Sequence, residues 1–132
     1  MGFKQKFPFE KRYKESFSIM QEYPYRVPII CEKDPNAQDM PNISRTKYLV
    51  PHDITVANFM FIIRKRINLE PEKSMYLFVG NKIMPATGQL MSQIYHKHKD
   101  ADGFLYFIYS GENTLGWIIL LGLDLRIYSV WG

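Results

Sequence analysis

The segment DITVANFMFIIRKRINL at residues 53–69 constrains the fold more than any other stretch of the chain. Its apolar residues recur at i, i+3, i+4, i+7 and i+11, which is the spacing of one face of an α-helix. These residues are Val56, Phe59, Met60, Ile63 and Ile67. Asp53 or Thr55 is available to cap the start. The pattern predicts a helix over residues 55–68 with one buried face, so other segments must supply a surface for it to cover.

Extended segments on both sides of this helix supply that surface. Residues 26–33 (RVPIICEK) and 46–51 (TKYLVP) enclose a turn-rich stretch at 34–42, which predicts a hairpin with a long loop. Residues 74–80 are a short apolar strand and residues 88–98 a short helix. Residues 103–111 form an apolar strand without strict alternation, which favours a central position covered on both faces. We expect this last strand to enter between the first two strands as a parallel neighbour.

An amphipathic helix is predicted in front of the sheet, after a short turn around residues 4–7. The stretch 9–23 places Phe9, Tyr13, Phe17 and Met20 at near-helical spacing, and Pro24 ends it. With 132 residues, 46% of them hydrophobic, the chain suits one compact core. The order of elements predicts an α+β fold of the ubiquitin-like β-grasp type, with a mixed four-stranded sheet and extra N-terminal helices.

The charge balance and the two chain ends limit the partners. Seventeen Lys and Arg against 13 acids give a net charge of +4, which suits acidic peptides, anionic lipid or nucleic acid about equally. The basic run at 64–66 lacks a neighbouring stacking motif, which argues against nucleic acid as a main partner. The N-terminus is too charged for a secretory signal, which predicts a cytoplasmic protein. The apolar run at 117–123 has seven residues, whereas a spanning helix needs about 20.

No catalytic constellation stands out. Cys31 lies among isoleucines in a strand pattern, which predicts an inert packed thiol with only Lys33 nearby to lower its pKa. His96 and His98 are two residues apart on a helix and point to different faces, so they predict a solvated basic turn and no metal site. Gly80, Gly88 and Gly111 are isolated and form no phosphate loop. The sequence therefore points to a protein that is not an enzyme and needs no cofactor.

Four segments, FPFEKR, YPYRVPIICEK, TKYLVPHDITVANFMFIIRKRI and KDADGFLYFIYSGENTLG, occur in this order. Together they closely resemble the autophagy-related protein eight family of ubiquitin-like modifiers, which includes GABARAP and the light-chain-three proteins. The resemblance covers residues 3–116. It implies a precursor that a cysteine protease cuts after Gly116, and that activating and conjugating enzymes then join to phosphatidylethanolamine on autophagosomes. A terminal glycine suits this chemistry because it carries no side chain that would block narrow catalytic channels.

The resemblance also implies a division of the chain and a peptide site. Residues 1–24 would be a helical segment, 25–116 the ubiquitin-like core, and 117–132 a hydrophobic extension removed by processing. Cargo receptors and adaptors would dock aromatic-x-x-aliphatic motifs beside the strand at 46–50. The aromatic pocket would comprise Glu15, Ile19, Pro28, Ile30, Lys47, Leu49 and Phe104. The aliphatic pocket would comprise Tyr48, Val50, Pro51, Ile54, Phe59, Ile62 and Ile63. Arg26 and Arg66, together with Lys47, would pair with acidic residues that flank the motif.

Other interpretations stay open at this point. The chain could be an unconjugated trafficking adaptor that binds peptides or microtubules through its basic N-terminal helix, or a small enzyme with Cys31 as nucleophile. Phe3 and Phe7 among lysines favour shallow contact with anionic lipid, whereas Phe9 is expected to cover the sheet. The tail could be a removable pro-segment, a segment packed in the receptor groove, or an isoform feature.

Overall fold

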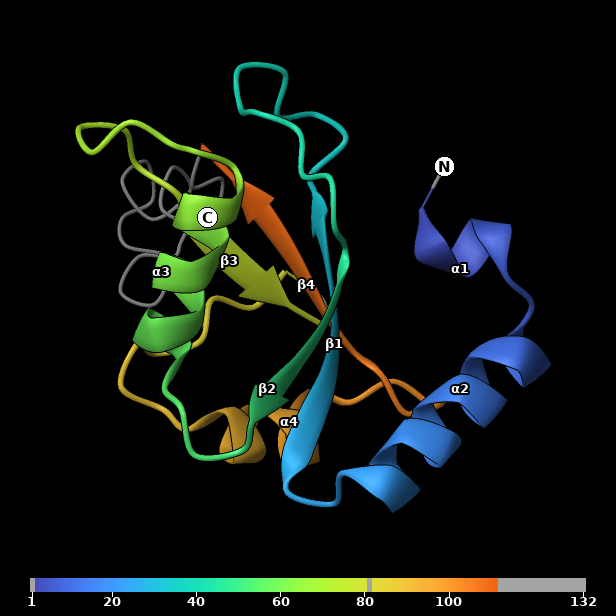
Figure 1. The fold of residues 1–132 in the computed structure, drawn as a ribbon. Helices are drawn as coiled ribbons and strands as arrows, with labels where there is room; N and C mark the ends of the chain where they lie inside the picture. The colour runs from blue at the N-terminus through green and yellow to red at the C-terminus, as the bar shows by residue number, and fades with distance from the viewer. Residues whose placement is uncertain (1, 81, 112–132) are drawn as a thin grey trace, which may run out of the picture.

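The computed structural model describes residues 2–80 and 82–111, and Figure 1 shows a twisted sheet with helices on both faces. Along the chain lie α1 (Phe3–Lys6), α2 (Phe9–Glu22), β1 (Arg26–Lys33), β2 (Lys47–Pro51), α3 (Val56–Arg66), β3 (Tyr76–Val79), α4 (Met91–His98) and β4 (Leu105–Ser110). The four strands form one mixed sheet in the order β2-β1-β4-β3. This arrangement confirms the predicted α+β fold. The turn expected around residues 4–7 is the single-turn helix α1.

The last strand, β4, is central and parallel to β1, as predicted, but its second neighbour was predicted wrongly. It lies between β1 and β3, because β1 and β2 pair directly as an antiparallel hairpin. In that hairpin Pro28 lies opposite Leu49, and Ile29 of the same strand lies opposite Leu105 of β4. The hairpin fills one edge of β1, so β4 can add only at the other. Among the described residues β2 is therefore an edge strand of the sheet.

Helix α3 covers one face of the sheet and contributes to the main core. Of the two capping candidates, Thr55 is the cap: its side chain accepts a hydrogen bond from the backbone N–H of Asn58, and Asn58 returns one to the Thr55 backbone. Phe59 and Ile63 of α3 are fully buried against the sheet. The predicted periodicity therefore identified the buried face correctly.

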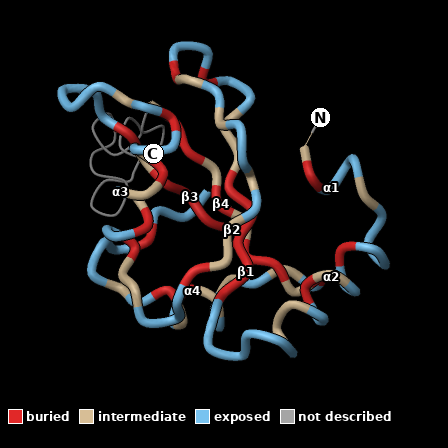
Figure 2. Tube along the Cα trace, in the orientation of Figure 1, coloured by how far each residue is buried: buried red, intermediate tan, exposed pale blue. Residues whose placement is uncertain are grey.

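Helices α1 and α2 lie on the opposite face, where the packing differs from the prediction (Figure 2). Phe3 is buried and packs with Ile30 and Phe104, and its ring centroid is 5.3 Å from that of Phe104. It covers the sheet and is not free to enter a lipid surface in this conformation. Phe9, which was expected to cover the sheet, is 49% exposed. Phe3 therefore has the sheet-covering position that was predicted for Phe9.

Helix α2 turns a polar side toward the domain. Its buried residues are Arg12 and Ser16, while the aromatic row Phe9, Tyr13 and Phe17 faces solvent. The rings of this row stack along the helix with centroids 6.0 and 6.2 Å apart. The apolar stripe that predicted the helix is thus not the side that docks it.

Candidate functional site

A groove opens between α2 and the hairpin edge of the sheet. Its volume is about 420 Å³, within the range of small-ligand sites. Its lining comprises Glu15, Ser18, Ile19, Pro28, Arg45, Lys47, Tyr48, Leu49 and Phe104. One wall is helical and the other is strand β2 with its neighbour β1. The groove therefore joins an apolar floor to an edge strand.

The strand register explains how the floor of the groove forms. Pro28 and Leu49 are cross-strand partners, and Phe104 immediately precedes Leu105, which pairs with Ile29. These three side chains therefore lie at one level across three strands. Because residues alternate between the faces of a sheet, Val27 and Ile29 enter the main core while Pro28 turns toward α2.

The ion pair between Lys47 and Glu15 connects the two walls of the groove. Both side chains are about half exposed, at 53% and 40%. An exposed pair of this kind adds little to folding stability. Lys47 can therefore exchange Glu15 for another carboxylate at small cost.

Six of the seven residues predicted for the aromatic pocket line this groove, and Ile30 does not. Ile30 has no exposed surface because the α1 residue Phe3 covers it. Sequence reasoning missed Ser18 and Arg45, and it placed Tyr48 only in the second pocket. Ser18 follows Glu15 by three residues, about one helical turn, so helical spacing could have predicted it. Arg45 lies in a loop, where no periodic pattern could have predicted it.

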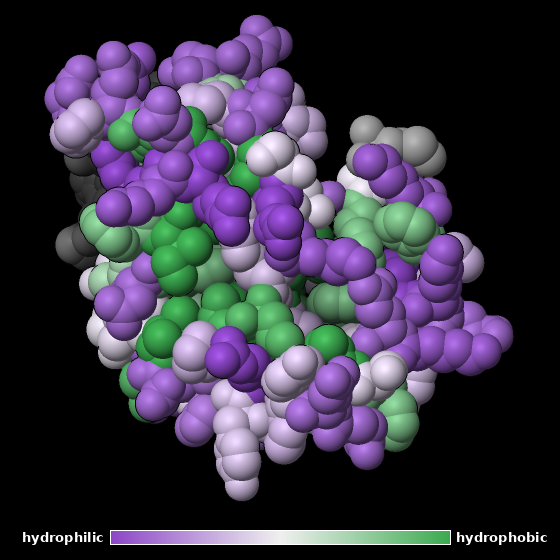
Figure 3. Space-filling model, viewed as in Figure 1, coloured by the Kyte–Doolittle hydropathy of each residue, from purple (hydrophilic) through white to green (hydrophobic). Residues whose placement is uncertain are grey.

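The residues predicted for the aliphatic pocket lie where β2 faces α3, and Figure 3 shows hydrophobic side chains gathered there within a hydrophilic surround. Pro51 is exposed, and Tyr48, Ile54 and Ile62 are half-buried. Phe59 and Ile63 are fully buried and Val50 is 4% exposed, so these three form the floor beneath the surface. A ligand could touch them only if the side chains above them, such as Tyr48 on Phe59, moved aside.

The two arginines predicted to meet acidic flanks both lie on the surface. The Arg26 guanidinium donates a hydrogen bond to the backbone carbonyl of Leu49, at 3.3 Å. Arg66 is the last residue of α3, where a cation is favoured by the helix dipole. Arg26 therefore borders the strand that carries the groove, and Arg66 is close enough to Tyr48 of that strand to interact with it electrostatically.

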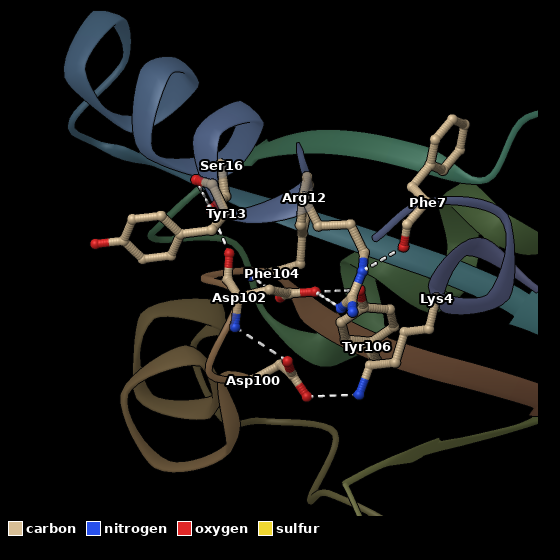
Figure 4. A network of polar contacts seen from close by, with 9 residues as sticks. All are labelled: Lys4, Phe7, Arg12, Tyr13, Ser16, Asp100, Asp102, Phe104 and Tyr106. Carbon is tan, nitrogen blue, oxygen red and sulfur yellow. Dashed lines mark hydrogen bonds and ion pairs between the residues drawn. The ribbon is translucent and has the colours of Figure 1, made fainter. Parts of the chain in front are cut away.

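A buried polar network fixes the helical wall of the groove (Figure 4). Asp102, which has no exposed surface, accepts hydrogen bonds from the Arg12 guanidinium and the Tyr106 hydroxyl, each at 2.5 Å. Ser16 donates to the backbone carbonyl of Asp102, also at 2.5 Å. Burial, with the hydrogen bond to Asp102 adding to it, raises the pKa of Tyr106. The network ties α2 to the loop that leads into β4.

Two remaining candidates have different outcomes. Cys31 has no exposed surface, and burial raises the pKa of its thiol, so it is protonated and inaccessible at neutral pH. This agrees with an inert packed thiol and removes the support for a nucleophile. Gly116 and the tail at 117–132 lie outside the described residues. In the described part of the chain, no helix is both long and apolar enough to cross a membrane.

Comparison with known proteins places these features in one family. Residues 11–116 match the family model described as autophagy protein Atg8, ubiquitin like. Autophagy-related protein 8 of Mycosarcoma maydis is 55% identical over 115 residues, covering 87% of this chain and 96% of that protein. Autophagy-related protein 8d of Arabidopsis thaliana is 53% identical over 115 residues, covering 87% and 94%.

Solved structures agree with this assignment. Plasmodium falciparum Atg8, solved in complex with a Plasmodium falciparum Atg3 peptide, has a TM-score of 0.78 at 39% identity and covers 85% of this chain and 97% of its own. Trypanosoma brucei ATG8 has the same TM-score and identity and covers 83% and 93%. The chain therefore belongs to the Atg8 family of autophagy ubiquitin-like proteins.

Proposed function

We propose that this chain is a non-enzymatic modifier that is cut after Gly116, joined to phosphatidylethanolamine through that glycine, and recruits partners with aromatic-x-x-aliphatic motifs to autophagosomal membranes. The observation that carries the proposal is the groove between α2 and β2, which collects six residues that the family resemblance assigned to one pocket. The related Plasmodium falciparum Atg8 has been solved with a peptide of Atg3, which supports peptide binding and a conjugating-enzyme partner.

The groove has the features that a strand-like ligand needs. The open edge of β2 offers backbone groups for hydrogen bonds, and the neighbouring pocket takes a side chain that gives specificity. Lys47 and Arg45 line this pocket and would attract acidic residues in the ligand. In the uncharged half of the site, the half-buried Tyr48, Ile54 and Ile62 would receive the aliphatic side chain.

Peptide titration tests the groove. We expect the chain trimmed at Gly116 to bind an acidic aromatic-x-x-aliphatic peptide with micromolar affinity, which is about 8 kcal/mol. Leu49→Ala should weaken binding several-fold by removing apolar contact, and Lys47→Glu should do so by repelling the acidic ligand. Lys97→Glu, the same charge change at an exposed site on α4, is the control. Equal affinity for all variants would exclude the assigned groove.

Mass spectrometry of the protein recovered from cells tests the processing step separately. Cleavage should leave a chain that ends at Gly116, and conjugation should add the mass of a lipid. Replacing Gly116 with Ala should remove both changes. An uncut wild-type chain, recovered where related family members are lipid-conjugated, would contradict the role given to Gly116.

A further inference from the structure

The residues that follow Gly116 have the pattern of a ligand for the groove. They read Trp117, Ile118, Ile119 and Leu120, which is an aromatic-x-x-aliphatic sequence. We propose that Trp117 and Leu120 of one copy occupy the groove of a second copy, so that uncut chains associate head to tail and block their own receptor site. This inference rests on the proposed peptide function of the groove.

The groove and the tail are complementary in size and polarity. A volume of about 420 Å³ beside Leu49, Pro28 and Phe104 gives an indole ring an apolar surface to cover. The tail run at 117–123 has no charged residue, and left in water it would form an apolar patch. Docking in the groove removes that patch from water and lets the tail backbone pair with the free edge of β2.

The reach of the chain selects a second copy as the donor. Phe104 lies at the level of the groove, and Gly111 is seven residues further along β4, or about 23 Å away at 3.3 Å per residue. Strand β2 is two strand spacings from β4, about 10 Å to the side. The straight path from Gly111 is then about 25 Å, whereas the six residues to Trp117 span at most about 20–22 Å. The backbone of Trp117 therefore cannot pair with β2 at the level of Leu49 in its own copy while β4 stays intact.

Association of this kind has two consequences. Each copy offers one tail and one groove in different places, so the contact is heterologous and adds copies in a row until a ring closes. Cleavage after Gly116 would remove every donor and free every groove at once. The uncut form would then be unable to compete for receptors at concentrations where it associates.

The dependence on salt concentration distinguishes this contact from receptor binding. Trp117 to Leu120 carry no charge, so their association should hold or strengthen as salt rises, as apolar burial does. An acidic receptor peptide should instead bind less well in salt, because its attraction to Lys47 is screened.

Sedimentation velocity of the full chain tests the proposal. Wild type should associate as concentration rises. Changing both Trp117 and Leu120 to Ala should move the association to at least about tenfold higher concentration, or roughly 1.4 kcal/mol. The matched control changes Ile118 and Ile119 to Ala and should associate more strongly than the first variant. Leu49→Glu in the groove should weaken association as much as the tail change does. If circular dichroism shows that Leu49→Glu does not fold, Ile19→Glu on the opposite wall of the groove repeats the test.

Mixing gives the sharpest outcome. The tail variant keeps a groove and the Leu49→Glu variant keeps a tail, so each alone should be monomeric while an equal mixture forms a dimer that cannot grow. A monomeric wild type, or no dimer in the mixture, would overturn the proposal. The proposal would also be overturned if Phe17→Ser lost association while Leu49→Glu still associated like wild type. That result would place the tail on the aromatic row of α2.

A fluorescence measurement supplies an independent readout. Both tryptophans of the chain lie in the tail, at positions 117 and 131, so Trp131→Phe leaves Trp117 as the sole reporter. Its emission should shift to shorter wavelength as concentration rises, and Leu49→Glu should abolish the shift. Binding of an acidic tryptophan-free receptor peptide to the tail variant tests the groove's receptor function separately. If that binding is normal and the shift is absent, only the present inference fails.

Discussion

Replacing Arg12 with Met should destabilise the domain far more than an ordinary salt-bridge mutation. The Arg12 side chain is 10% exposed and its partner Asp102 is fully buried, with the two joined at 2.5 Å. Methionine preserves much of the side-chain length but removes the positive charge. A buried carboxylate is then left without its cation, which costs about 3–5 kcal/mol. For a domain of this size we expect the melting temperature to fall by about 10–20 °C.

The control for burial lies in the same part of the structure. Lys4 donates to Asp100 at 2.6 Å, but its side chain is 45% exposed and that of Asp100 26%. Lys4→Met should therefore cost less than about 1 kcal/mol. Changing Arg12 to Met and Asp102 to Asn together should cost less than the sum of the single changes, because no unpaired charge remains in the double variant.

Urea and thermal unfolding followed by far-UV circular dichroism measures these differences, since both tryptophans lie in the tail. Similar losses for Arg12→Met and Lys4→Met would refute the reasoning, because they would show that burial does not govern the cost. Additive losses in the double variant would refute it in another way. They would mean that Arg12 and Asp102 do not act as a pair.

Two further predictions concern the same region. Gly103 has φ +90°, and a Cβ added there would lie 2.3 Å from Ser16 Oγ. Gly103→Ala should therefore lower the free energy of unfolding by about 1–3 kcal/mol, measured by thermal unfolding. Gly88→Ala is the control and should cost much less, because no atom lies within 4 Å of a Cβ added at Gly88. Although burial opposes it, hydrogen bonding to Lys4 and to a backbone N–H lowers the pKa of Asp100. The stability that ionised Asp100 contributes is present above the ordinary aspartate pKa and is lost as pH falls through the lowered value. Wild type should therefore lose more free energy of unfolding than Lys4→Met during acid titration. Parallel curves of stability against pH for the two proteins would contradict this.

The sequence predicted the elements whose pattern is local and repeated. Helix α3 and strand β1 were found because Phe59 and Ile63 recur on one helical face and because the strand is continuously apolar and β-branched. The groove followed from the family resemblance, which assigned Leu49 and Lys47 to it. The prediction that Ile30 lines the pocket was wrong, because Phe3 covers it from a short helix that the sequence predicted only as a turn. No local pattern records a contact between residues 27 positions apart.

The orientation of α2 is the most informative difference between pattern and structure. Its aromatic row and its buried polar pair, Arg12 and Ser16, have centres about 80° apart around the helix axis, at 100° per residue. Burying the aromatic row would have turned the helix by that amount and carried Ile19 to about 120° from the buried direction. Ile19 would then leave the groove.

Directional bonds to Asp102 hold the helix at the rotation that keeps Glu15, Ser18 and Ile19 facing β2. The exposed phenylalanines are the cost of that choice, since apolar burial would have favoured the other rotation. Natural proteins depart from such local rules mainly at functional sites. The departure therefore falls on the one helix that forms a wall of the proposed peptide groove, and it supports a functional rather than a structural reason for the polar docking of α2.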